Sequence, residues 1–172
     1  MTIKAREVLR DCGSLLAELT KDPPAELWRL RWAGLVTLLR AVGHVLHKID
    51  GPSSPEARQV IGSAWEELKT SKPEPKILWE FIVSERNNVL KAYAFGPRIK
   101  NITVRPGPAW VNLATGESGG SPGGPTTFDR FMRSGAFEGH DPRQLCREAI
   151  AFWSDYLDTI DHKAAERQRP AG

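Results

Sequence analysis

Apolar residues recur at helical spacing along most of this chain. The first such segment ends at "KDPP" (21–24), because proline cannot donate a backbone hydrogen bond, and the second runs from Ala25 to Gly51. A third lies in "SSPEARQVIGSAWEELK" (53–69), where a serine and Pro55 mark the start of a helix. A fourth runs from "KPEPK" (72–76) through Tyr93, and a fifth begins at Asp141 and Pro142. The pattern predicts five helices.

Helical periodicity stops between the fourth and fifth segments. Residues 97–127 are rich in Gly, Ser and Pro, and within them Ile102–Val104 and Trp110–Leu113 have the length and composition to pair as a short hairpin. The tail 163–172 is expected to fray. We therefore predict an all-α fold, an antiparallel four- to five-helix bundle in a single domain 1–172, with an insert at 97–127.

Composition limits the protein class. A chain of 172 residues with 40% apolar residues can bury a core without disulfides or metal, and its net charge of +3 does not by itself indicate a nucleic-acid or membrane protein. Charged residues occupy the region where a signal peptide would need an apolar core, and no apolar run approaches the roughly 20 residues that cross a bilayer. We expect a cytoplasmic protein without membrane association.

An arginine, Arg86, interrupts the apolar stripe of the fourth helix. On a helical wheel the following residues fall within about 60° of it: Trp79, Ile82, Val83, Val89, Leu90 and Tyr93. Because arginine stays charged, a buried guanidinium must meet a carboxylate, a subunit interface or a bound anion such as phosphate. Arg31 also falls on the apolar side of its helix, which favours structural ion pairs for both arginines.

The stretch "RNNVLKAY" (86–93) resembles the motif of the HEPN families. In that motif an arginine and a following polar residue precede a histidine by four to six positions, often with a tyrosine two positions beyond. Arg86, Asn87 and Tyr93 match the motif, and Lys91 stands where the families have histidine. The resemblance covers the helical bundle loosely and the motif at this one stretch.

The resemblance implies a homodimer whose motif helices face each other. Many members are metal-independent ribonucleases of toxin–antitoxin or anti-phage systems, so it also implies RNA and a cognate antitoxin as partners, with no cofactor. By analogy Arg86 clamps an RNA phosphate, Asn87 orients it, Lys91 is the proton carrier or a second clamp, and Tyr93 closes the site. A lysine, with an ordinary pKa of about 10.4, would act as a base only if that pKa were lowered.

A basic strip follows the motif. Between Arg86 and Gly116 the sequence has no Asp or Glu, and Arg98, Lys100 and Arg105 add positive charge there, together with Trp110 as a stacking group. Positive charge with aromatic side chains is typical of single-stranded RNA binding, so these four residues are predicted to bind RNA. The alternative is a solvated surface loop.

Other chemistry has weaker support. His44, His47 and Asp50 have a spacing open to metal ligands, but they spread over much of the helix circumference and no second cluster completes a site, so no metal is expected. No phosphate-binding glycine loop or nucleophile elbow occurs. The competing hypothesis is a non-catalytic helical binding module, in which Arg86 forms an ion pair and the insert contacts the partner.

Overall fold

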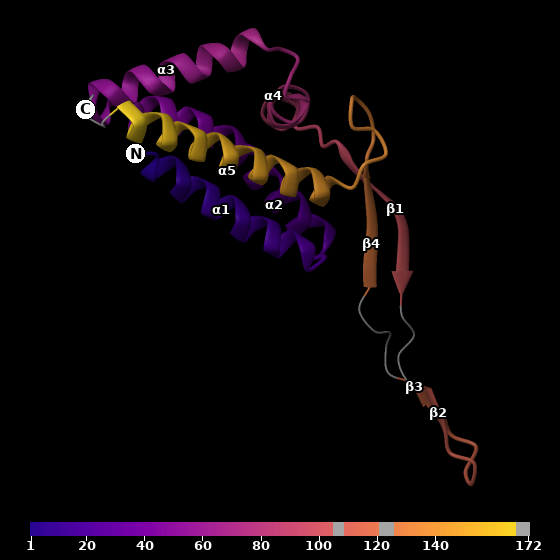
Figure 1. Ribbon diagram of the computed structural model, residues 1–172. Helices are drawn as coiled ribbons and strands as arrows, with labels where there is room; N and C mark the ends of the chain where they lie inside the picture. The colour runs from indigo at the N-terminus through magenta and orange to yellow at the C-terminus, as the bar shows by residue number, and fades with distance from the viewer. Residues whose placement is uncertain (105–108, 121–125, 168–172) are drawn as a thin grey trace.

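The computed structural model describes residues 1–104, 109–120 and 126–167 (Figure 1). Its helices are α1 (Ile3–Thr20), α2 (Ala25–Val45), α3 (Pro55–Thr70), α4 (Val83–Ala92) and α5 (Pro142–Arg167). Three shorter segments adjoin them. The π-helical segment η1 (Leu46–Asp50) extends α2, the 3-10 segment η2 (Gly51–Ser53) precedes α3, and the π-helical segment η3 (Ile77–Ile82) precedes α4. The described part of the chain is therefore mostly helical, and the five predicted helices are confirmed.

Two helix starts show how local sequence and distant contacts both fix the helices. The hydroxyl of Ser54 accepts the N–H of Ala57 at 3.0 Å, with Pro55 at the first helical position of α3, as the sequence predicts. At α1 the cap comes from another element, because the Asp50 carboxylate accepts the N–H groups of Lys4 and Ala5 at 3.0 and 2.9 Å. Asp50 thus ties η1 to the start of α1.

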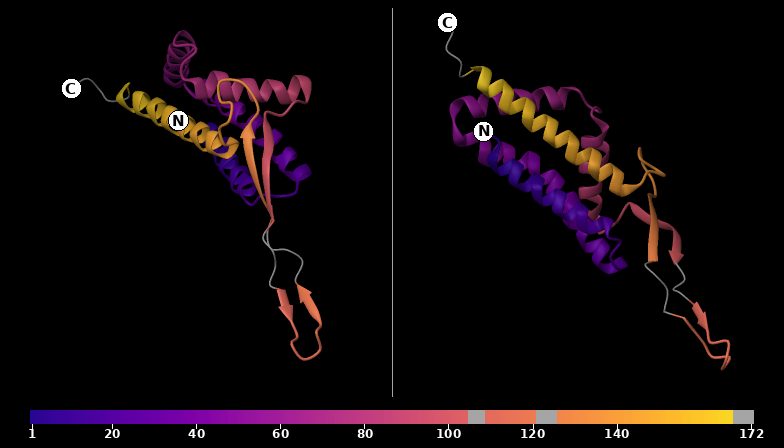
Figure 2. Two further views of the ribbon diagram at one scale, coloured as in Figure 1. Left: turned by 90° about the vertical axis from the view of Figure 1, so that its right-hand side faces the viewer. Right: turned by 60° about the horizontal axis from the view of Figure 1, so that its bottom comes forward.

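The core lies where α1, α2, α5 and the η3–α4 segment meet (Figure 2). Its largest fully buried side chains include Trp32, Phe81 and Trp153. At Gly43 of α2, a Cβ atom would lie 2.7 Å from Cη2 of Trp153, so this position has no room for a side chain. Close approach of α2 to α5 therefore depends on Gly43.

The predicted helical fold is confirmed in its main part, but the fold is not purely all-α, because the described residues also form two small antiparallel sheets. β1 (Pro97–Val104) pairs with β4 (Thr126–Met132), with Pro97 opposite Met132 and Val104 opposite Thr126. β2 (Ala109–Val111) pairs with β3 (Ser118–Gly120).

The predicted pairing of Ile102–Val104 with Trp110–Leu113 is wrong. The partner of β1 is "TTFDRFM" at 126–132, whose β-branched and aromatic residues fit a strand but which lies at and beyond the edge of the predicted insert.

The two sheets follow one another in an arm that leaves the helices (Figures 1 and 2). β1 and β4 lie side by side at its base, and β2 and β3 lie farther out. At the base, Arg133 donates its N–H to the carbonyl of Gly96 at 2.9 Å, and Arg130 forms an ion pair with Asp22 at 2.7 Å. These contacts join the base of the arm to the helical body.

No helix among the described residues is both long and apolar enough to span a membrane. The last helix, α5, continues to Arg167, and the remainder of the predicted tail, 168–172, lies outside the described residues.

Candidate functional site

Arg86 lies on the flank of α4 and is half-buried. Its Nη1 donates a hydrogen bond to Oδ1 of the adjacent Asn87 at 3.0 Å. No carboxylate among the described residues lies within ion-pair distance of Arg86. Of the three explanations for this arginine, a carboxylate partner therefore has no support within the described chain.

The residue that α4 buries is the preceding one, Glu85, which is 5% exposed. Its carboxylate accepts the N–H of Gly96 at 3.2 Å and the side-chain amide of Asn88 at 3.3 Å, and burial raises its pKa. Leu90 and Tyr93 are 54% and 63% exposed. The buried face, which also carries Phe81 and Val89, is thus turned by about one residue from the predicted one.

Arg86 shares a surface hollow with residues of α2. The hollow has a volume of about 300 Å³ and is lined by Thr37, Arg40, Ala41, His44 and Arg86. Arg40 is half-buried, and its pKa is lowered first by burial and then by the positive charge of Arg86. Two guanidinium groups that repel one another, with no acidic residue lining the hollow, favour the binding of an anion.

A second hollow adjoins the first along α2. It has a volume of about 320 Å³, and Arg40, Gly43, His44, His47, Lys48 and Trp65 line it. The guanidinium of Arg40 stands 5.9 Å from the ring centre of Trp65. Burial and then the positive charges of Lys48, Lys69 and Arg40 lower the pKa of His47. The two hollows share Arg40 and His44, so they form one continuous basic surface.

Helical spacing explains this surface. Arg29, Arg40, His44 and Lys48 follow one another at intervals that place them along one side of α2 and η1. α4 packs against α2 and brings Arg86 to the same side. The surface is therefore a row of basic side chains assembled from two helices.

Arg31 provides a contrast within the same helix. Its Nη2 lies 3.3 Å from Oε2 of Glu18, and its Nη1 donates to the backbone carbonyl of that residue at 3.3 Å. Arg31 is thus a structural ion pair between α1 and α2, as its position on the predicted apolar side favoured.

The remaining motif residues are not gathered around Arg86. Asn87 is half-buried and accepts the hydrogen bond from Arg86, whereas Lys91 is exposed. Tyr93 ends α4 in the left-handed conformation, with φ of 47°, and its ring meets that of Phe95 edge-on at 5.1 Å. Neither Lys91 nor Tyr93 lines the hollow of Arg86. The structure brings Asn87 to Arg86 and leaves the other two outside the hollow.

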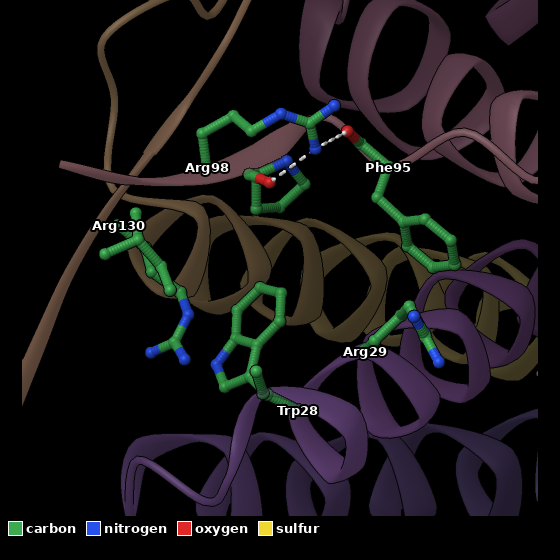
Figure 3. A pocket seen from close by; sticks show the side chains of 8 residues that line it. Trp28, Arg29, Phe95, Arg98 and Arg130 are labelled. Atoms are coloured by element: carbon green, nitrogen blue, oxygen red, sulfur yellow. Dashed lines mark hydrogen bonds between the residues drawn. The ribbon is translucent and has the colours of Figure 1, made fainter.

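The basic strip is divided between two places. Arg98 and Lys100 are exposed on β1, and Arg98 lines a pocket with Trp28 and Arg29 of α2 (Figure 3). Trp110 lies in β2 opposite Gly119. Arg105 and the side chain of Trp110 lie outside the described residues.

Sequence reasoning missed Arg40 and His44 as partners of Arg86. Their spacing on α2 was visible in the sequence, but nothing local indicated that α4 would pack beside this face. The sequence spacing instead groups His44 with His47 and Asp50 as candidate metal ligands. The Asp50 carboxylate is occupied by the amides of α1, and no cluster of three metal-binding side chains occurs in the part of the chain that is described.

Comparisons with protein-family models, with curated proteins and with solved structures give no match for this chain. The geometry of the site therefore carries the functional argument.

Proposed function

We propose that this protein binds RNA through the hollow of Arg86 and Arg40, and that it is a HEPN-like antiparallel helical bundle. The observation that carries the proposal is the absence of any carboxylate partner for either arginine within the described chain. A phosphodiester would neutralise both guanidinium groups and relieve their repulsion. Asn87 holds the guanidinium of Arg86 by accepting its hydrogen bond.

Metal-independent RNA cleavage, as in toxin or anti-phage defence, is a second candidate function. Cleavage requires a group that takes the proton from the ribose 2′-hydroxyl. The 2′-oxygen then bonds to phosphorus as a 2′,3′-cyclic phosphate, the P–O5′ bond breaks, and the leaving 5′-oxygen takes a proton from water. The family resemblance assigns that role to Lys91. The position of His44 in the same hollow as Arg86 favours His44 instead, with the arginines stabilising the charge that develops on the phosphate.

The proposal includes a homodimer formed through α2 and α4, and a cognate antitoxin as partner. The exposed Leu90 and Tyr93 on α4 support such a contact, since large apolar side chains at the surface favour association. In the competing hypothesis the protein is a non-catalytic binding module, and the arm of β1 to β4 contacts the partner.

Retention and cleavage of a structured RNA in the presence of EDTA test this proposal. We expect Arg86→Gln or Arg40→Gln to weaken RNA binding about tenfold, because each removes one charge-assisted phosphate contact. Arg10→Gln, which removes an exposed arginine of α1, is the control and should change affinity less than twofold. Equal losses of RNA affinity in all three variants would mean that the net charge of the protein, and not this hollow, determines RNA binding.

Two further variants separate the competing hypotheses. Val104 lies opposite Thr126, so an Asn-Gly turn can replace residues 105–125 and close β1 on β4. We expect this shortened protein to keep its Arg86-dependent RNA binding. Under the competing hypothesis the arm contacts the partner, so the shortened protein would no longer bind that partner. His44→Gln should abolish any cleavage while leaving RNA retention intact; unchanged cleavage would exclude His44 as the proton acceptor.

A further inference from the structure

A pocket separate from the Arg86 hollow lies between the start of α2 and the base of the arm (Figure 3). Its volume is about 370 Å³, within the range of small-molecule sites. The residues that line it are Ala25, Trp28, Arg29, Phe95, Pro97, Arg98, Ile99 and Arg130. Three of them are arginines and none is acidic, so the pocket combines an apolar interior with positive charge.

One wall of the pocket is fixed by packing. The ring of Trp28 is 5% exposed and stacks on Trp32 at 5.3 Å. The guanidinium of Arg130 stands 4.4 Å from the ring centre of Trp28, and it pairs with Asp22 at 2.7 Å. Arg130 therefore holds the wall in place, and Trp28 presents a rigid aromatic edge to the pocket.

Two exposed arginines form the rim. The Nη1 of Arg98 donates to the carbonyls of Phe95 and Pro97 at 2.9 and 3.2 Å, which orients its guanidinium beside the pocket (Figure 3). Arg29 forms no ion pair with the described residues. Both guanidinium groups keep N–H donors for a ligand, because only one nitrogen of Arg98 is engaged.

We propose that this pocket binds a nucleotide, with its heterocyclic ring against Trp28 and Phe95 and its phosphate on Arg98. The ligand class follows from the lining, since an apolar aromatic interior accepts a flat ring and the basic rim accepts one anionic group attached to it. We further infer that this nucleotide is one unit of a bound RNA strand, and this identification of the ligand rests on the proposed function.

The position of Arg29 supports this source. Arg29 and Arg40 lie on the same side of α2, eleven residues apart, which is about 16 Å along a helix. At roughly 3.4 Å or more per nucleotide, a strand of a few nucleotides spans that distance. The pocket would hold one base while the Arg86 hollow holds a phosphate farther along the same strand.

Calorimetry with adenosine 5′-monophosphate, adenosine and ribose 5-phosphate tests the pocket without any RNA. We expect the nucleotide to bind at least about tenfold more tightly than either fragment, because only it uses both the interior and the rim. No binding, or equal binding of nucleotide and ribose 5-phosphate, would overturn the proposal.

Variants locate the bound nucleotide. Ala25→Trp, at an exposed position, should fill the pocket, and Arg98→Gln should remove the phosphate contact; each should cost about tenfold in nucleotide affinity. The control Arg10→Gln, on α1 and outside both sites, should leave nucleotide affinity unchanged, and a loss there would contradict the assignment to this pocket. If the protein bound the nucleotide but not RNA, the pocket would remain a nucleotide site and the proposed RNA-binding function would be refuted.

Discussion

Arg86 and Arg40 are the residues on which the functional argument depends. Both are half-buried, and the positive charge of Arg86 lowers the pKa of Arg40. Such repulsion opposes folding, so it is expected at positions that serve binding rather than stability. Arg31, on the same helix, shows the other solution, because Glu18 lies beside it.

The buried carboxyl of Glu85 should make folding stability depend on pH. Its pKa is raised in the folded state, so the folded protein binds this proton more tightly, and stability falls as the pH rises through the raised value. Glu85→Gln keeps an acceptor for the N–H of Gly96 and cannot ionise. We expect it to match the wild type near pH 4 and to exceed its stability at pH 8, as measured by urea unfolding.

Glu85→Ala is the matched comparison. It leaves the N–H of Gly96 without its acceptor, so we expect a loss of about 1–3 kcal/mol at pH 4. A Gln variant whose stability followed the wild type at every pH between 4 and 8 would show that Glu85 ionises normally.

At the scale of elements, α2 connects the core to the site. Trp32 and Gly43 are buried, and Arg40 and His44 line the hollow on an adjoining side of the helix, where Gly43 also lines the second hollow. Gly43 lies where the two regions meet, because a Cβ atom there would be 2.7 Å from Cη2 of Trp153 and 3.5 Å from Nη1 of Arg40.

Two glycine substitutions test this packing. Gly43→Ala would place a methyl group 2.7 Å from Cη2 of Trp153, and we expect it to lower the free energy of unfolding by about 1–3 kcal/mol. Gly62→Ala in α3 meets nothing within 4 Å and should raise it by about 0.5–1 kcal/mol through helix propensity. Chemical denaturation measures both, and equal effects at the two positions would refute a close contact at Gly43.

The helices could be predicted from the sequence because the residues that start and end a helix are local to it. Ser54 and Pro55 begin α3 as predicted, and the prolines at 23 and 24 separate α1 from α2. The Asp50 cap of α1 comes from a residue 45 positions away, and no local pattern contains it.

The strands and the site were harder to predict because they depend on distant partners. β1 pairs with a segment more than twenty residues farther along the chain, whereas a short hairpin was the local expectation. Arg86 and Asn87 were identified from one stretch, but the meeting of Arg86 with Arg40 and His44 results from helix packing. The burial of Glu85 could not be predicted from its residue type either, since glutamate is rarely buried.

For the whole molecule, the proposed dimer gives a direct prediction. Leu90 is 54% exposed on α4, and we expect Leu90→Glu to weaken self-association at least about tenfold in sedimentation equilibrium, since it places a charge in the interface. Leu113→Glu, at a position in the arm that is 96% exposed, is the control and should not change the association state. A wild-type protein that stays monomeric at high concentration would contradict the dimer.

We propose that Arg86 serves ligand binding and not the fold. Measuring unfolding free energy and RNA affinity on the same preparation of Arg86→Gln tests it most directly, beside Arg31→Gln. We expect Arg86→Gln to keep its stability within about 0.5 kcal/mol or to gain some, while losing about tenfold in RNA affinity, and Arg31→Gln to show no such loss of affinity. A clear loss of stability in Arg86→Gln with unchanged RNA affinity would instead assign Arg86 to the fold and exclude it from RNA binding.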